Sequence, residues 1–192
     1  MVRGLGATNK GDGMDELSKL GLKYGTDKIG KHNYLPIYYD LFKDRRNEVK
    51  KVLEIGVGEG AGLRMFHDFF PNATIYGAEI DEKRIFKEDR IDVTKCDQSK
   101  LKDIENIIGL VLSRDPFQGQ IDLIIDDGSH KSSDQIFTCL AVAKLLLGKQ
   151  YLTYVIEDVS EPEIVDLLKE NYSAKLIKCG ERYDDNLIIV NF

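Results

Sequence analysis

The sequence has no apolar run long enough to cross a membrane and no excess of basic charge. Its apolar stretches fall short of the roughly 18–20 residues that a membrane span needs, and its first residues lack the apolar region of a signal peptide. The formal net charge is −6, whereas general nucleic-acid binding usually depends on a basic surface. We therefore expect a cytoplasmic protein that binds neither membranes nor nucleic acid in general.

Cysteine is also scarce. The chain has three cysteines, Cys96, Cys139 and Cys179, and no C-x-x-C pair. This odd number and wide spacing argue against a disulfide framework and against a thiolate zinc site. We expect all three side chains to be buried and reduced.

The length of 192 residues suits one domain with a sizeable core. The hydrophobic fraction of 42% and the charged fraction of 31% are ordinary for a globular protein. Residues 1–13 contain four glycines and little apolar content, so they are predicted to be a flexible tail or a linker. Residues 14–192 are predicted to form a single domain, in which about residues 14–48 make a helical cap.

From residue 51 onward, β-like apolar runs alternate with segments of helical periodicity. Strands are predicted at Lys51–Ile55, Thr74–Glu79, Arg90–Lys95, Ile121–Asp126 and Tyr154–Glu157. Helices are predicted at Asp15–Leu22, Tyr34–Phe42, Ala61–Phe69, Lys100–Leu112, Ser133–Leu147 and Glu161–Asn171, and two final β-like runs at Ala174–Cys179 and Asn186–Phe192. This order predicts an α/β fold with a Rossmann-like, doubly wound, seven-stranded sheet, mostly parallel with a C-terminal antiparallel hairpin.

A glycine-rich turn follows the first predicted strand. Glu54 precedes three alternating glycines, Gly56, Gly58 and Gly60, with Glu59 between the last two. Glycines allow a tight turn and a close approach of the backbone to a ligand. This pattern predicts a nucleoside-binding crevice that includes Glu54, Gly56, Gly58 and Glu59.

Acidic residues also follow the next two strands. Asp81 comes just after the second strand, where a carboxylate can accept hydrogen bonds from ribose hydroxyls. Asp97 and Gln98 follow the third strand, and a carboxylate there can accept a hydrogen bond from an adenine amino group. We predict that all three residues bind the cofactor.

Two cofactors compete for this crevice. Residues 56–61 also fit the G-x-G-x-x-A dinucleotide fingerprint, with Asp81 about twenty residues further on. However, Glu54 and Glu59 would repel a pyrophosphate, which prefers the positive N-terminus of a helix. The sulfonium and amino group of S-adenosylmethionine suit such acidic surroundings, so the sequence favours this cofactor over NAD. The alternative to both is a strand–helix turn that binds no ligand.

A second acidic group follows the fourth and fifth strands. Asp126 ends the fourth and is followed by Asp127 and His130, and Glu157 ends the fifth and is followed by Asp158. Carboxylates that converge at this edge of an open α/β sheet repel one another unless a cation is bound. Their hard oxygens select Mg²⁺, Mn²⁺ or Ca²⁺. The alternative is that these acids cap the following helices.

A metal beside a histidine suits the activation of a hydroxyl group. An alcohol barely ionises at neutral pH, and a divalent ion lowers the pKa of an oxygen bound to it. His130 is the natural general base for the remaining proton transfer. We therefore assign catalytic roles to Asp127 and His130.

Taken together, these motifs resemble those of class I S-adenosylmethionine-dependent methyltransferases, over about residues 50–192. A narrower resemblance includes residues 24–28 (Y-G-T-D-K), residues 32–38, the D-D-G-S-H motif at 126–130 and the I-E-D motif at 156–158. These are similar to metal-dependent sugar O-methyltransferases of macrolide biosynthesis, of the mycinamicin type, and to rhamnosyl and cephalosporin-hydroxylase-like enzymes.

The resemblance implies roles for individual residues. Asp127, Glu157 and Asp158 would be ligands of Mg²⁺ or Mn²⁺, and His130 would be the base. Tyr24 and Thr26 would lie in a segment that closes over the cofactor or the substrate. The cofactor-binding residues are then Tyr24, Thr26, Glu54, Gly56, Gly58, Glu59, Asp81, Asp97, Gln98 and Asp126.

The aromatic residues of the second predicted helix and His32 are harder to assign. Tyr34 and Tyr38 have helical spacing, so packing on the sheet is the simpler interpretation and an aromatic wall for a sugar ring is the alternative. For His32, a position in the substrate pocket and a solvated loop are both open.

The expected function is methyl transfer from S-adenosylmethionine to a hydroxyl of a sugar in a glycoside or glycan. The expected partner is a small sugar or glycoside acceptor, and a homo-oligomer is compatible with the sequence. Two alternatives stay open: an NAD-linked oxidoreductase, and a non-catalytic nucleotide-binding domain of a longer protein.

Overall fold

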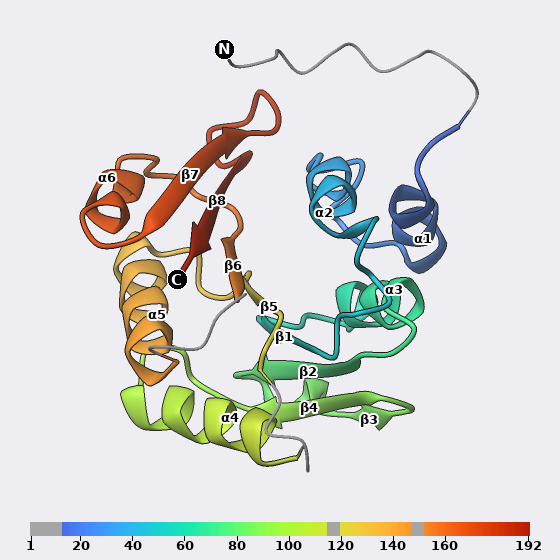
Figure 1. The fold of residues 1–192 in the computed structure, drawn as a ribbon, viewed down its shortest axis with the longest axis horizontal. Helices are drawn as coiled ribbons and strands as arrows, with labels where there is room; N and C mark the ends of the chain where they lie inside the picture. Colours follow the sequence, from blue (N-terminus) through green and yellow to red (C-terminus); the bar gives the residue numbers. More distant parts are fainter. Residues whose placement is uncertain (1–12, 115–119, 147–151) are drawn as a thin grey trace.

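The computed structural model describes residues 13–114, 120–146 and 152–192 (Figure 1). Its elements follow one another as α1 (Glu16–Tyr24), α2 (Leu35–Phe42), β1 (Lys51–Ile55), α3 (Ala61–Phe69), β2 (Thr74–Glu79), the 3-10 turn η1 (Glu82–Arg84), β3 (Lys87–Glu88), β4 (Ile91–Lys95), α4 (Leu101–Ser113), β5 (Leu123–Asp126), α5 (Ser132–Leu145), β6 (Thr153–Ile156), α6 (Ile164–Lys169), β7 (Ser173–Lys178) and β8 (Asn186–Asn191). Of the predicted tail or linker at residues 1–13, all but Gly13 lies outside the described residues, as does the predicted helix end at residue 147.

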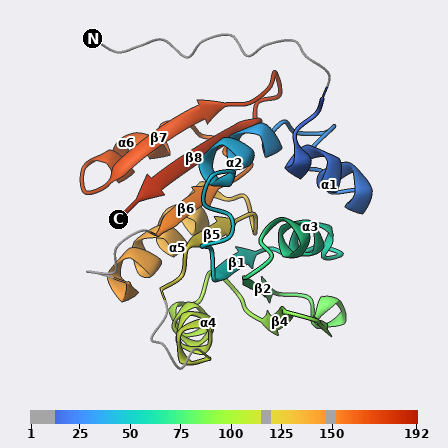
Figure 2. The ribbon, with the colours of Figure 1, turned by 45° about the vertical axis from the view of Figure 1, so that its right-hand side comes forward.

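The strands form one sheet in the order β3-β4-β2-β1-β5-β6-β8-β7. The five central strands β4, β2, β1, β5 and β6 are parallel, while β3, β8 and β7 run antiparallel to their neighbours. Figure 2 shows β7 and β8 side by side at one edge of the sheet. The doubly wound α/β fold and its C-terminal antiparallel hairpin are therefore confirmed.

The number of strands differs from the prediction of seven, because the sheet has eight. The additional strand, β3, consists of two residues, Lys87 and Glu88, which pair with Asp92 and Ile91 of β4. Both β3 residues are exposed. A strand this short and charged leaves no apolar alternation in the sequence by which it could be recognised.

Helices cover both faces of the sheet, with α1–α3 on one side and α4–α6 on the other (Figure 1). Successive strand residues face opposite sides. Val52 and Ile125 join the core beneath α1–α3, and their neighbours Leu53 and Ile124 join the core beneath α4–α6. This burial on both faces explains the apolar pairs Val52–Leu53 of β1 and Ile124–Ile125 of β5.

The segment between α1 and α2 begins at a well-defined helix end. Asp15 caps α1 by accepting a hydrogen bond from the Ser18 amide at 2.8 Å. Gly25 then adopts a left-handed conformation with φ 69°, and its amide bonds to the Gly21 carbonyl at 2.9 Å. This sharp stop turns residues 26–34 away from the helix, and Lys28 and Tyr34 contact the ends of β5 and β6.

Two further sequence expectations concern the cysteines and the membrane. Cys96 and Cys139 are buried, Cys179 is half-buried, and all three are free thiols. Within the described residues, no helix has both the length and the apolar character needed to span a membrane.

Candidate cofactor and metal site

A cavity of about 810 Å³ opens where the central strands end. In an open α/β sheet, this edge is the usual ligand crevice. The residues that line it come from five loops: Gly25–Lys28, Glu54–Glu59 with Ala61 and Gly62, Ala78–Ile80 with Arg84, Cys96–Ser99, and Asp127–Lys131 with Asp134. Thr26, Glu54, Gly56, Gly58, Glu59, Asp97 and Gln98, all predicted from the sequence to bind the cofactor, therefore lie around one cavity.

The glycine loop can approach the end of β5 because it has no side chain at one position. Gly56 has φ 83°, and a Cβ there would lie 2.1 Å from the Asp127 carbonyl oxygen. The Asp127 amide donates to the Ile55 carbonyl at 2.9 Å in the same place. Gly56 thus keeps the cofactor crevice and the acidic end of β5 in contact.

Glu79, at the end of β2, holds the glycine loop in place. Its Oε2 accepts hydrogen bonds from the amides of Val57 at 3.0 Å and Gly58 at 3.2 Å. Its Oε1 accepts from the Asp81 amide at 2.9 Å. Sequence reasoning missed Glu79 and selected Asp81, although Glu79 is the residue with which the predicted strand ends.

Asp81 lies elsewhere. It caps η1, where its Oδ1 accepts from the Lys83 amide at 3.0 Å, and it is not among the residues that line the cavity. The side chain of Glu79 is buried, whereas that of Asp81 is 46% exposed. The geometry therefore places the carboxylate of Glu79, rather than that of Asp81, at the cavity.

Asp126 lies behind the cavity rather than in its wall. It is 1% exposed and accepts hydrogen bonds from Gln98 Nε2 at 2.9 Å and from the Tyr154 hydroxyl at 3.0 Å. Burial raises its pKa from the ordinary 3.8 to about 6. Gln98 in turn accepts from the Ser129 amide at 2.6 Å, so Asp126 and Gln98 connect the ends of β4 and β5.

Tyr24 also lies outside the cavity lining. Its hydroxyl donates to Asp68 of α3 at 2.6 Å, beside the Lys23 ammonium, which lies 2.7 Å from the same oxygen. Tyr24 therefore attaches the end of α1 to α3, while Thr26, two residues later, reaches the cavity.

A buried lysine lies at the centre of the acidic group. Lys28 is 2% exposed, and its Nζ lies 2.7 Å from Asp127 Oδ2, 2.6 Å from Glu157 Oε2 and 3.0 Å from Glu54 Oε1. Burial lowers the pKa of Lys28, but attraction to Asp127, Glu157 and Glu54 outweighs this effect and raises it well above the ordinary value. Burial raises the pKa of Glu54 and Glu157, because it disfavours their charged forms. The Lys28 ammonium opposes this effect only in part, since it is shared among three carboxylates.

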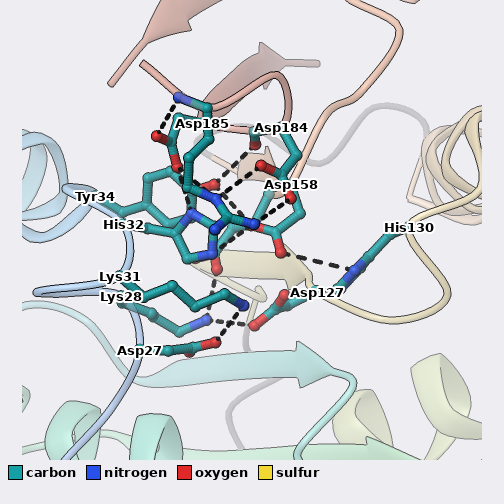
Figure 3. Close-up of polar contacts among 12 residues, drawn as sticks. Asp27, Lys28, Lys31, His32, Tyr34, Asp127, His130, Asp158, Asp184 and Asp185 are labelled. Atoms are coloured by element: carbon teal, nitrogen blue, oxygen red, sulfur yellow. Dashed lines mark hydrogen bonds and ion pairs between the residues drawn. The ribbon is translucent and has the colours of Figure 1, made fainter. Parts of the chain in front are cut away.

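Asp127, His130 and Asp158 form a second cluster on the other side of Asp127. One ligand atom from each residue lies within 4.8 Å of the others. His130 Nε2 lies 3.2 Å from Asp127 Oδ1, and its Nδ1 lies 3.6 Å from Asp158 Oδ2. Figure 3 shows His130 approaching these carboxylates from the side opposite Lys28 and His32.

The hydrogen bond to Asp127 and the charges of Asp127 and Asp158 raise the pKa of His130 to about 9. His130 and Lys28 hold the pKa of Asp127 below its usual range despite its burial.

The backbone is strained at two members of this cluster. Among the described residues, the non-glycine positions with positive φ are Arg90, His130 and Asp158, with φ of 51°, 57° and 51°. Such conformations persist where the surrounding structure enforces them, and they concentrate at functional sites. Here the His130 ring lies 3.6 Å from Asp158 on one side and 3.2 Å from Asp127 on the other.

Three side chains from the segment before β1 contact acids at the opposite side of the site. Two of these acids follow β6, and the third lies in the turn between β7 and β8. The Tyr34 hydroxyl donates to Asp158 Oδ1 at 2.6 Å, and the Tyr38 hydroxyl donates to Glu157 Oε1 at 2.5 Å. His32 stacks on Tyr34, and its Nδ1 lies 2.7 Å from Asp185 Oδ1. His32 is buried, not solvated, and both tyrosines combine core packing with a polar contact.

The predicted metal ligands thus divide into two groups. Asp127 and Asp158 share a cluster with His130. Glu157 has its two oxygens on Lys28 and Tyr38 instead, and its role as a metal ligand stays a prediction. The carboxylates of Asp127 and Asp158 are hard oxygen donors that fit Mg²⁺ or Mn²⁺ when water or substrate oxygens complete the coordination.

The fold and the glycine-lined crevice are those of an α/β methyltransferase. The methyltransferase MycE from the mycinamycin pathway, solved in complex with Mg and SAH, matches with a TM-score of 0.73 and 27% identity, over 92% of this chain and 54% of that one. A second structure of MycE, which also contains mycinamycin VI, matches with a TM-score of 0.72 and 29% identity, over 92% of this chain and 54% of that one.

The sequence relatives narrow the class. The chain is 34% identical to the 8-demethyl-8-alpha-L-rhamnosyl tetracenomycin-C 2'-O-methyltransferase of Streptomyces olivaceus, over 77% of this chain and 39% of that protein. It is 38% identical to the mycinamicin VI 2''-O-methyltransferase of Micromonospora griseorubida, over 60% of this chain and 29% of that protein. No protein-family model matches the chain.

The resemblance seen in the motifs is therefore confirmed: the chain is a homologue of sugar O-methyltransferases of the mycinamicin and tetracenomycin type. It spans less than half the length of these relatives.

Proposed function

We propose that this chain is an S-adenosylmethionine-dependent O-methyltransferase that uses a divalent metal ion and methylates a hydroxyl of a sugar in a glycoside or glycan. The observation that carries the proposal is the cluster of Asp127, His130 and Asp158, of which Asp127 and His130 line the glycine-rich cavity and His130 and Asp158 have strained backbone conformations. The names of two relatives, a rhamnosyl tetracenomycin-C 2'-O-methyltransferase and a mycinamicin VI 2''-O-methyltransferase, support the choice of acceptor.

The contacts of the glycine loop support S-adenosylmethionine over NAD. In a dinucleotide site, the loop amides face the pyrophosphate. Here the amides of Val57 and Gly58 already donate to the Glu79 carboxylate, and Glu54 and Glu59 add negative charge to the same wall. A pyrophosphate would be repelled, whereas a ligand with a sulfonium, an amino group and ribose hydroxyls would be attracted.

Asp127 and Asp158 would hold the metal ion, and the family resemblance adds Glu157. A divalent ion bound there lowers the pKa of the acceptor hydroxyl and orients it. Tyr34 leaves the second oxygen of Asp158 free for this purpose, because its hydroxyl bonds to Oδ1 while Oδ2 faces His130. Hydrogen bonds of this kind orient metal ligands and strengthen their binding.

His130 would take the proton of the acceptor hydroxyl. With a pKa of about 9, His130 is protonated at neutral pH as long as Asp127 and Asp158 carry uncompensated charge. It becomes a competent base once a cation neutralises these carboxylates, because the attraction that retains its proton is then reduced. The proposal therefore couples base activity to occupation of the metal site.

The proposal includes a cytoplasmic location. It also includes no general binding of nucleic acid, which the net charge of −6 supports. The proposed partner is a small sugar or glycoside.

Calorimetric titration with S-adenosylmethionine and with NAD, each with and without Mg²⁺, tests the cofactor. Micromolar binding of S-adenosylmethionine and no binding of NAD is expected. Turnover is then measured on a panel of glycosides with Asp127→Ala and His130→Ala, which should lose activity and keep cofactor binding. Binding of NAD alone would refute the proposal, and tight cofactor binding without turnover on any sugar would favour a non-catalytic domain.

A further inference from the structure

We propose that the Lys28 ammonium is a resident cation of this site, seated in a position formed by Glu54, Asp127 and Glu157 that a second divalent metal ion takes when the ammonium is removed. This inference rests on the metal site of the proposed function, which it extends to a neighbouring position. Asp127 is shared, because its Oδ2 faces Lys28 and its Oδ1 faces His130.

The geometry around Nζ resembles the surroundings of a bound ion. Three carboxylate oxygens from the ends of three adjacent strands lie 2.6–3.0 Å from Nζ. Mn²⁺ and Ca²⁺ accept hard oxygen ligands of this kind, at 2.3–2.6 Å for Ca²⁺. Movements of about 0.5 Å by each carboxylate would complete such a position.

One oxygen of the group has no partner. Glu54 Oε2 is buried and makes no hydrogen bond among the residues that the structure describes, although Glu54 Oε1 lies 3.0 Å from Nζ. An unpartnered buried carboxylate oxygen is costly. It belongs to a buried side chain whose other oxygen contacts the ammonium, and this burial distinguishes the group from a chance cluster of surface acids.

The backbone of the segment that contains Lys28 is held in place on both sides of this residue. The left-handed Gly25 ends α1, and the Lys28 carbonyl accepts from the Tyr34 amide at 3.1 Å. Tyr38 bonds to the same carboxylate as Lys28, Glu157, through the other oxygen. Lys28 is thus a positioning residue: it holds Asp127 and Glu157 together before any metal ion binds and keeps the divalent site single.

The experiment compares Mn²⁺ binding to the wild-type chain, Lys28→Met, Lys28→Arg and Lys31→Met, by calorimetry and electron paramagnetic resonance at neutral pH. Lys28→Met should bind a second Mn²⁺, because the ammonium that occupies the position and repels a cation is gone. Two ions that share Asp127 should also broaden each other's resonance.

Lys28→Arg keeps the charge and should bind one ion with the wild-type affinity within about 3-fold. Lys31→Met is the matched control, since Lys31 is 47% exposed and pairs with Asp27, and it should change the affinity by less than about 2-fold.

A folded Lys28→Met that binds Mn²⁺ no better than the wild type would overturn the inference. If Lys28→Met shows no cooperative thermal unfolding in EDTA, its thermal unfolding is measured again with Mn²⁺. Recovery of the transition by Mn²⁺ would support the inference, and failure to recover would refute it.

A different result would refute the proposed function. A wild-type chain that binds no Mn²⁺ would refute its metal site, while a gain of binding in Lys28→Met would still support the resident cation.

Discussion

The two halves of the site are held together by contacts of different range. In the cofactor half, formed by residues 54–60, Glu79, Asp97 and Gln98, the Glu79 carboxylate binds amides 22 and 21 residues away. In the metal half, formed by Asp127, His130, Glu157 and Asp158, the partners are side chains of residues 28–38. Lys28 is 99 residues from Asp127, and Tyr34 is 124 residues from Asp158.

This difference teaches how each half can fail. The residues of the cofactor half follow or end β1, β2 and β4, which are neighbours in the sheet, so this half forms largely with the sheet, and Gly25–Lys28 adds one part of the cavity wall. The metal half also needs the segment before β1 to dock on the strand ends, where it supplies an ammonium and two hydroxyls to buried carboxylates. Changes in that segment should therefore affect metal binding and turnover more than cofactor binding.

The largest expected effect separates the halves directly. Asp158→Asn should lower turnover about 1000-fold, because the metal's contribution of several kcal/mol is lost. Binding of S-adenosylhomocysteine should stay within about 3-fold, since Asp158 does not line the cavity. Steady-state kinetics with Mg²⁺ and calorimetry measure the two effects.

Asp166→Asn, on the exposed side of α6 where Asp166 pairs with Lys169, is the matched control and should leave both unchanged. Parallel losses of turnover and cofactor binding in Asp158→Asn would contradict the separation of the halves.

Asp126, between the two halves, is expected to make the free energy of unfolding depend on pH. Burial raises the pKa of Asp126 from 3.8 to about 6, so this carboxyl stabilises the fold at low pH and loses that contribution as the pH rises through about 6. Asp126→Asn cannot ionise. Relative to the wild type, its free energy of unfolding should therefore rise by about 2.4 kcal/mol between about pH 4 and pH 8.

Urea denaturation of both proteins at the two pH values measures this change. A stability difference that is the same at both pH values would show that Asp126 titrates normally in the folded chain.

Within the cofactor half, Glu79 and Asp81 form a natural pair of test positions. Glu79→Gln should weaken S-adenosylhomocysteine binding about 10- to 50-fold, because it removes a charged acceptor of the loop amides. Mn²⁺ affinity should not change. Asp81→Asn removes a carboxylate that faces the Lys83 amide outside the cavity, so its effect should be below about 3-fold. A larger effect for Asp81→Asn would support the sequence prediction that Asp81 binds the cofactor.

The smallest expected effect tests the long-range contacts. Tyr34→Phe keeps the ring that stacks on His32 and removes the hydroxyl that donates to Asp158. Mn²⁺ affinity should fall about 10-fold, as is typical when an outer partner of a metal ligand is lost. Tyr39→Phe, on the same helix and packed on Phe69, is the control. Equal effects of the two variants would rule out a specific role for the Tyr34 hydroxyl.

Much of the fold could be predicted because its signals are local. The bounds of β1 and β2 agree with the prediction, since an apolar run followed by glycine or acid marks a buried parallel strand. Gly56, Asp127 and Asp158 could be selected as candidate site residues for the same reason, because strand ends in a doubly wound sheet meet at one edge. Strand β3 was missed, since two charged residues form no pattern.

The sequence by itself determined the class of the chain: the order of strands and helices, the glycine loop, and the acidic strand ends that resemble a sugar O-methyltransferase. Only the tertiary structure decided which carboxylate faces which partner. It placed Glu79 on the loop amides, Asp126 behind the cavity, and Glu157 on Lys28 and Tyr38. The reason is that the partner of an acid depends on its burial and on side chains distant in the sequence. Neither can be read from the neighbouring residues along the chain.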